Sequence, residues 1–187
     1  MSFIDNYLSD LKSLIDALPA AQIEALAEHL HRVWAAGGKV LLMGNGGSSS
    51  TASHIVNDLQ KCIGLDTGKG LRTMCLSDCT PLILAWGNDT EFANIYAPQV
   101  ECWAEPGDLV IAISGSGNSP NILNGVTAGK AKGAHVFGLA GFGGGKLAGM
   151  CDDCLTVFSN NMQRVEDIHM IVLHLAFSML RERVTAK

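Results

Sequence analysis

The sequence lacks a long apolar run, an excess of positive charge and a dense set of cysteines. No apolar stretch reaches the roughly 18 residues of a membrane-spanning helix, and the first residues do not carry the basic region of a signal peptide. The formal net charge of -5 provides no basic surface for nucleic acid or for an anionic membrane. We therefore expect a cytoplasmic protein that binds no nucleic acid directly and no membrane, and that holds any anion through local groups.

The six cysteines are scattered through apolar segments, unlike the framework of a small secreted domain, and we expect them to be reduced. Cys151 and Cys154 have the spacing of a zinc knuckle or a redox pair. Because no second pair of this kind exists to complete a four-sulfur site, chance spacing at the start of a strand is the favoured interpretation.

Short apolar runs alternate with helical segments along most of the chain. The 187 residues, 48% of them hydrophobic, fit one well-buried α/β domain spanning 1–187. Two amphipathic stretches within residues 2–36 predict a leading helical hairpin, which either covers the sheet or packs against another subunit. Strands are predicted near 40–44, 72–76, 109–113, 135–139 and 155–158, and the longer helices at 49–62, 91–103, 120–132 and 164–183. Because this alternation builds parallel βαβ units, ligand loops are expected at the carboxyl ends of the strands.

Two of the predicted strands run into glycine and serine, from Gly44 to Ser50 and from Ser114 to Ser119. A helix start after such a turn offers unpaired backbone N–H groups and the positive end of a dipole, and serine adds hydroxyl donors. Each hydrogen bond to a charged group contributes roughly 1.5–3 kcal/mol, so a few of them hold a phosphate without lysine or arginine. The loops lack the Gly-Lys-Ser/Thr ending of a Walker loop and the third glycine of a dinucleotide fingerprint. Helix capping is the alternative role for any single serine.

These motifs resemble the SIS (sugar isomerase) domain. The resemblance is carried by Gly44-Asn45-Gly46-Gly47-Ser48, by His54 beyond it, and by the run from Ser114 to Ser119. Gly143 to Gly149, and Arg164 to His169 ahead of His174, are similar to the phosphoheptose isomerase branch. The resemblance covers almost the whole chain. It implies a three-layer flavodoxin-like fold with a five-stranded parallel sheet, a homotetramer, and interconversion of sedoheptulose 7-phosphate with a heptose 7-phosphate.

An aldose-ketose isomerase needs a base for a carbon-bound proton and an acid for the oxygens. His54 and Asp58 are four residues apart on a predicted helix and share a face, whereas Glu166 and His174 lie on the last predicted helix. Taken alone, these residues favour solvated charges and a core histidine. The resemblance instead assigns proton transfer to Asp58 and His174. The chain departs from the branch at Asp58, which replaces a glutamate, at Glu166, which replaces a glutamine, and at Gln163, which replaces an aspartate.

Some members of that branch bind zinc, and the resemblance implies that the ligands here are His54, Asp58, Glu166 and His174. Two imidazoles and two carboxylates form an acceptable zinc shell. Glu166 and His174 are eight residues apart, roughly 12 Å along a helix axis, so a bend, long side chains or assembly across subunits must bring them together. No organic cofactor is expected.

We hypothesise a sugar-phosphate isomerase that works through an enediol. The expected substrate-binding residues come from the two loops, Asp89 and the last helix: Asn45, Gly46, Gly47, Ser48, Asp89, Ser114, Gly115, Ser116, Ser119 and Glu166. The serines are expected to hold the phosphate, while Asn45, Asp89 and Glu166 contact the sugar or support the site. The alternative is a non-catalytic SIS protein that senses a sugar phosphate or scaffolds protein partners, as replication-initiation relatives do, and the three departures motivate it.

Overall fold

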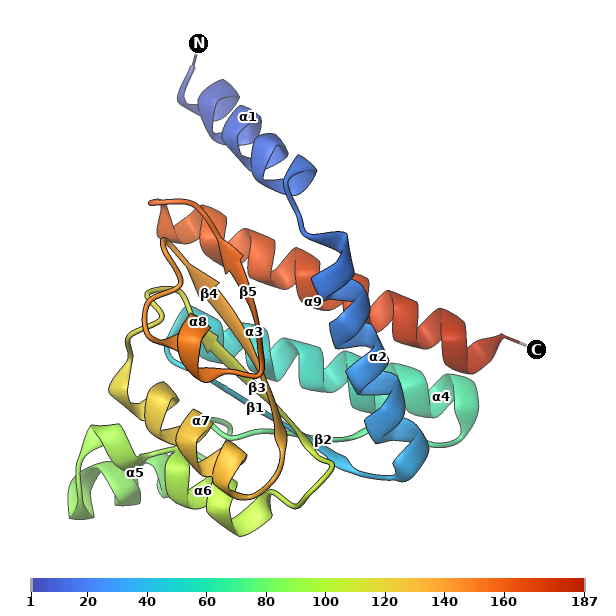
Figure 1. The fold of residues 1–187 in the computed structure, drawn as a ribbon, viewed down its shortest axis with the longest axis vertical. Helices are drawn as coiled ribbons and strands as arrows, with labels where there is room; N and C mark the ends of the chain where they lie inside the picture. Colours follow the sequence, from blue (N-terminus) through green and yellow to red (C-terminus); the bar gives the residue numbers. More distant parts are fainter. Residues whose placement is uncertain (1, 187) are drawn as a thin grey trace.

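A parallel sheet of five strands forms the centre of the molecule (Figure 1). The structure is a computed structural model that describes residues 2–186. The strands are β1 (Lys39–Gly44), β2 (Arg72–Cys75), β3 (Leu109–Ser114), β4 (His135–Gly141) and β5 (Asp153–Val157), in the spatial order β2-β1-β3-β4-β5. All neighbouring strands are parallel. The five predicted strands are confirmed to within a few residues, and their order is that of a flavodoxin-like fold.

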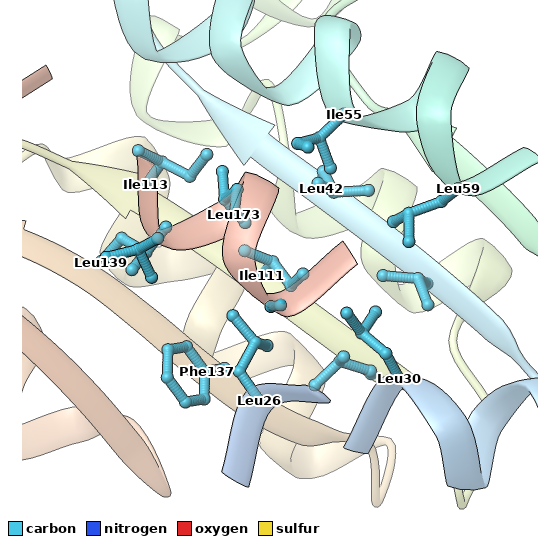
Figure 2. Close-up of a cluster of buried hydrophobic side chains, with 14 of the residues drawn as sticks. Leu26, Leu30, Leu42, Ile55, Leu59, Ile111, Ile113, Phe137, Leu139 and Leu173 are labelled. Atoms are coloured by element: carbon cyan, nitrogen blue, oxygen red, sulfur yellow. The ribbon is translucent and has the colours of Figure 1, made fainter. Parts of the chain in front are cut away.

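Both faces of the sheet are buried, because helices cover each of them. On one face lie α2 (Ala20–Ala36), α3 (Gly47–Asn57) and α9 (Met162–Thr185). Figure 2 shows the packing there, with Leu26 and Leu30 of α2 and Leu173 of α9 against Leu42, Ile111 and Phe137 of the strands. Every residue of β3, the central strand, is buried. Burial on both sides explains why the strands read as continuous apolar runs rather than as alternating patterns.

The opposite face carries the remaining helices of the central region. These are α5 (Thr80–Asp89), the 3-10 turn η2 (Phe92–Asn94), α6 (Ala97–Trp103), α7 (Pro120–Ala131) and α8 (Leu147–Met150). Leu41 and Met43 of β1 point to this side, where they pack with Tyr96, Val100 and Val126. The single helix expected over 91–103 is therefore split in two, and α6 begins next to Pro98, which suits the first turn of a helix.

The two leading helices are present, but they do not fold back on each other as a hairpin. α1 (Phe3–Asp16) extends beyond the body of the molecule, and α2 continues in nearly the same direction (Figure 1). α1 contacts α9, where Arg164 Nη2 lies 2.8 Å from Asp10 Oδ2 and Tyr7 donates a hydrogen bond to Asp167. Leu11 and Leu14 of α1 also pack against the core. Because α1 rests on α9 at one end, most of its surface stays open.

The helix predicted over 49–62 changes its winding half-way along. α3 ends at Asn57, a π-helical segment η1 spans Asp58–Cys62, and α4 (Ile63–Thr67) completes the run. Single-turn π segments inside α-helices occur frequently at functional sites, and this one begins at Asp58. Within residues 2–186, none of the helices combines the length and the apolar character that crossing a bilayer requires.

Candidate functional site

The first glycine-serine loop is a tight turn between β1 and α3. Gly46 caps α3 with φ of 53°, a left-handed value that favours glycine. A Cβ on Gly44 would lie 2.5 Å from the Ser48 carbonyl oxygen, so a side chain at Gly44 is excluded as well. The turn buries Ser48 at the start of α3, at the carboxyl end of β1. This is the location that the sequence predicts for a ligand loop.

The second loop follows β3 and lies beside the first, because β1 and β3 are neighbours in the sheet. The Ser114 hydroxyl donates a hydrogen bond to the Ser119 hydroxyl across the loop, at 3.3 Å between the oxygens. The glycine-rich segment after β4, which contains Gly144 and Gly145, packs against this loop. Gly117 has φ of 65°, and a Cβ there would lie 2.1 Å from the Gly144 carbonyl oxygen. The two backbones can approach this closely because Gly117 has no side chain.

Between the two loops lies a pocket of about 180 Å³, which we call the serine pocket. It is lined by Asn45, Ser48, Ile113, Ser114, Gly115, Ser116, Ser119, Met162 and Glu166. Seven of the ten predicted substrate-binding residues therefore lie around one cavity. No lysine or arginine lines it, so an anion there depends on hydroxyls, backbone N–H groups and the helix starts at Gly47 and Pro120.

Glu166 contributes the one charged side chain among the residues that line the serine pocket. Its carboxylate lies over the start of α3, with Oε1 2.6 Å from the place that a Cβ of Gly47 would occupy. Gly47 thus makes room for this carboxylate. A carboxylate is stabilised at a helix N-terminus, which is also where a phosphate is expected to bind.

Of the predicted substrate-binding residues, Gly46, Gly47 and Asp89 do not line the pocket. Ser49, the next serine of the first loop, bonds instead to Ser77 after β2, at 2.8 Å between the hydroxyl oxygens. Asp89 is exposed at the end of α5, where it accepts a hydrogen bond from Asn88, and it does not line the serine pocket. Its assignment to the sugar site stays a prediction.

Sequence reasoning missed the residues that hold Asn45 in place. Asn45 and Asn121 exchange two side-chain hydrogen bonds, at 2.9 and 2.8 Å, and Tyr96 donates to the Gly44 carbonyl. Asn121 is 1% exposed at the start of α7. The usable signal was a polar residue directly after Ser119-Pro120, at the carboxyl edge of the sheet. Met162 was also missed, and nothing in its local sequence marks it as a pocket residue.

The predicted proton-transfer residues come together where α3 and η1 meet α9. His54, Asp58 and His174 form what we call the imidazole cluster. The two Nε2 atoms are 3.0 Å apart, and Asp58 Oδ2 lies 3.7 Å from His54 Nε2 and 3.6 Å from His174 Nε2. The two histidine side chains are about half exposed and that of Asp58 is 17% exposed. The expectation that His174 is a core histidine is therefore wrong.

Three of the four expected metal ligands lie in this cluster. Glu166 lies instead in the serine pocket, because the eight-residue separation along α9 keeps it away from His174. Two imidazole nitrogens and one carboxylate oxygen within 4.8 Å of one another are a donor set that fits zinc with an open fourth position.

Known proteins share the fold and much of the sequence of this chain. The SIS domain family matches residues 3–141. The chain is 37% identical to a phosphoheptose isomerase of Trichlorobacter lovleyi, over 97% of this chain and 93% of the relative. The structure of a phosphoheptose isomerase from Francisella tularensis superposes with a TM-score of 0.87 at 30% identity, covering 97% of this chain and 100% of that one. For a phosphoheptose isomerase from Neisseria gonorrhoeae the TM-score is 0.84 at 28% identity, with 95% and 97% covered. The chain belongs to the SIS domain family, within its phosphoheptose isomerase branch.

Proposed function

We propose that this protein is an isomerase that interconverts sedoheptulose 7-phosphate and a heptose 7-phosphate. The observation that carries the proposal is that the serine pocket and the imidazole cluster are built on the same two helices. Ser48 and Asp58 belong to the run that starts with α3, and Glu166 and His174 belong to α9. One substrate that lies along these helices can reach both.

The phosphate end of the substrate binds in the serine pocket. Ser48, Ser114, Ser116 and Ser119 supply hydroxyl donors there, and the starts of α3 and α7 add the positive ends of their dipoles. Gly46, Gly47 and Gly115 let the backbone approach the phosphate. Asn45 and Glu166 contact the sugar or support the site, and the Asn121 amide keeps Asn45 oriented.

The sugar end reaches the imidazole cluster, where Asp58 and His174 exchange protons. In an aldose-ketose isomerisation, a base removes a proton from the carbon next to the carbonyl and returns it to the neighbouring carbon, while an acid moves a proton between the two oxygens. The imidazole cluster combines one carboxylate with two imidazoles, so it contains groups that can act as the base and as the acid. His54 lies against His174 and helps to position it.

A heptose phosphate is long enough to extend from the serine pocket towards the imidazole cluster. A seven-carbon chain with a terminal phosphate spans about 9 Å when extended, since three backbone bonds span about 3.3–3.6 Å. Glu166 and His174 are separated by roughly 12 Å along the axis of α9, so a shorter sugar phosphate would leave a larger gap. A long sugar with its phosphate at the far end therefore suits this arrangement.

Zinc and assembly belong to the same proposal. His54, Asp58 and His174 would hold a zinc ion, which when bound would polarise a sugar oxygen. The protein works as a single-domain subunit of a cytoplasmic homotetramer, and assembly covers the half-exposed imidazole cluster as well as α1. Two observations support this: the exposure of both histidines and the open apolar surface of α1.

The direct test follows sedoheptulose 7-phosphate by NMR in the presence of the protein. We expect product from the wild type and a loss of at least about 100-fold in turnover for Asp58→Asn, because a general base contributes 10²–10⁴-fold. Glu182→Gln, which removes an exposed carboxylate farther along α9, should leave turnover unchanged. If sedoheptulose 7-phosphate raises the melting temperature but no product forms, the isomerase proposal is wrong and a sensing or scaffolding role takes its place.

A further inference from the structure

A second group of metal-binding side chains lies at the opposite edge of the sheet. His29 of α2, His135 at the first position of β4 and Asp153 at the first position of β5 form what we call the basal cluster. His135 and Asp153 sit at the amino ends of their strands, whereas the serine pocket lies at the carboxyl ends. Strands of six or seven residues rise by about 3.3 Å per residue, so roughly 20 Å separates the two places. The proposed isomerase reaction makes no use of the basal cluster.

We infer that the basal cluster is a second zinc site, formed by His29 Nε2, His135 Nε2 and one oxygen of Asp153, with water as the fourth ligand. The three donors come from three different elements that pack in the hydrophobic core, so the fold itself holds them together. The inference does not depend on what the imidazole cluster does.

His29 Nε2 lies at the distance from Asp153 that two ligands of a tetrahedral zinc ion have, and His135 Nε2 would have to move outwards by about 0.4 Å. Asp153 Oδ2 lies 2.9 Å from His135 Nε2 and 3.4 Å from His29 Nε2. With zinc bonds of about 2.0–2.2 Å, two ligands in a tetrahedron lie roughly 3.3–3.5 Å apart. The imidazole rings of His29 and His135 are stacked, with centroids 3.7 Å apart and planes 20° apart. Both Nε2 atoms lie near the same carboxylate oxygen. Zinc binding requires one ring to rotate out of the stack, so that the in-plane lone pairs of both nitrogens point at the ion.

A cavity of about 280 Å³ lies beside the two rings and is bordered by Val33, Asp108 and Leu109. It leaves room for a water ligand.

Arg32 competes with the metal for His29. Arg32 Nη2 lies 2.8 Å from His29 Nδ1, and because a guanidinium only donates, Nδ1 accepts and the ring proton is on Nε2. Zinc at Nε2 moves that proton to Nδ1, so the Arg32 side chain must swing away. It is exposed and has Glu28 as another partner, at 3.9 Å. Arg32 therefore weakens zinc binding without preventing it.

The test counts zinc ions bound by the full-length protein, using equilibrium dialysis followed by elemental analysis. His29→Gln and His135→Gln should each lose one zinc equivalent per chain relative to the wild type. His31→Gln is the matched control, since it removes an imidazole from the same turn of α2 without touching the basal cluster. His174→Gln separates the two sites, because it removes a ligand from the imidazole cluster and should leave the basal zinc in place.

Two further measurements keep the inference open to refutation if a histidine variant folds poorly. Arg32→Gln should bind the basal zinc several-fold more tightly than the wild type does. Cobalt substituted into the His174→Gln protein should give the visible absorption of a tetrahedral site, and the His135→Gln change should abolish it. Zinc binding that is unchanged by His29→Gln and His135→Gln, or that disappears entirely with His174→Gln, would overturn the inference.

Discussion

At the scale of single residues, Glu166 affects how tightly the serine pocket binds an anion. Its carboxylate lies over the start of α3, in a pocket without lysine or arginine. A phosphate that enters brings a second negative charge, and two unit charges about 4 Å apart repel by on the order of 1–4 kcal/mol near a protein surface. The carboxylate therefore occupies part of the cradle that the phosphate uses.

We predict that Glu166→Gln binds inorganic phosphate about fivefold or more tightly, a change that corresponds to roughly 1 kcal/mol. Isothermal titration calorimetry at low ionic strength measures it. Asp167→Asn is the control, because it makes the same change in charge at the next residue, whose carboxylate faces Tyr7 of α1 instead. Equal or weaker phosphate binding by Glu166→Gln would show that the carboxylate does not oppose the anion.

His169 links the stability of the protein to pH. It is buried, its Nε2 lies 3.0 Å from the Ala140 carbonyl oxygen, and burial lowers its pKa from 6.5. The unfolded chain consequently binds the proton more readily than the folded one does. The free energy of unfolding is largest above about pH 6.5 and falls as the pH drops below it, by at most about 1.4 kcal/mol per pH unit.

Urea unfolding of His169→Gln between pH 7.5 and 5.5 checks this. The variant should be less stable at pH 7.5, since the packing of the buried imidazole is lost. Its free energy of unfolding should fall less steeply with decreasing pH. Burial lowers the pKa of His29 as well, so a part of the slope should remain. His31→Gln should keep the full slope. A slope in His169→Gln as steep as that of the wild type would contradict the assignment.

At the scale of elements, the serine pocket depends on the loop behind it. The glycine-rich segment after β4 touches the Ser114–Ser119 loop through Gly117, whose missing side chain allows a close backbone contact with Gly144. The Leu147 amide also donates to the Gly117 carbonyl at 2.9 Å. These contacts hold the loop that carries three of the phosphate-binding serines.

We predict that Gly117→Ala separates the Ser114–Ser119 loop from the glycine-rich segment after β4. Its positive φ and the overlap with Gly144 should cost about 1–3 kcal/mol of stability, and the displaced serines should bind phosphate more weakly. Thermal melts with and without phosphate measure both effects. Gly143→Ala is a matched control, because a Cβ there meets no atom within 4 Å and the residue has no left-handed φ. If the two variants melt alike, the close contact does not support the pocket.

The strands and the two ligand loops were predictable because their signals are local. A strand buried on both faces is apolar throughout, and a turn that needs glycine and serine shows them in the sequence. The pairing of Asn45 with Asn121 was not predictable, since it joins residues 76 positions apart. The π-helical turn at Asp58 was also missed, because the residues of that turn carry no composition that distinguishes it from an α-helix.

Distance in the fold also explains where the structure departs from the pattern that the sequence suggests. Asp89 lies at the exposed end of α5, outside the serine pocket, and its role at the sugar stays a prediction. The ligand set of four was divided because two turns of α9 separate Glu166 from His174. Periodicity identified α1 correctly as a helix, but it says nothing about which surface the helix packs on, and so the hairpin arrangement was wrong.

At the scale of the whole molecule, α1 is a helix without a core of its own. A capping box between Ser2 and Asp5 begins it, yet none of its residues is buried, and an isolated helix of 14 residues is marginal in water. Phe3 is 81% exposed and Leu8 57%, and Ile4 and Ile15 are also exposed. An apolar stripe of this size on an extended helix needs a covering surface, which the proposed tetramer supplies through other copies of the chain.

We predict that Leu8→Glu, which places a charge in the middle of the stripe, dissociates the assembly. Burying a charge at an apolar contact is costly, so sedimentation velocity should show smaller species than the wild type at the same concentration. Lys12→Glu is the control, because it changes a charge on the same helix at an exposed position outside the stripe and should leave the assembly intact. Turnover should fall with dissociation, since the half-exposed imidazole cluster would lose its cover. A Leu8→Glu protein that sediments and turns over like the wild type would mean that α1 does not hold the copies together.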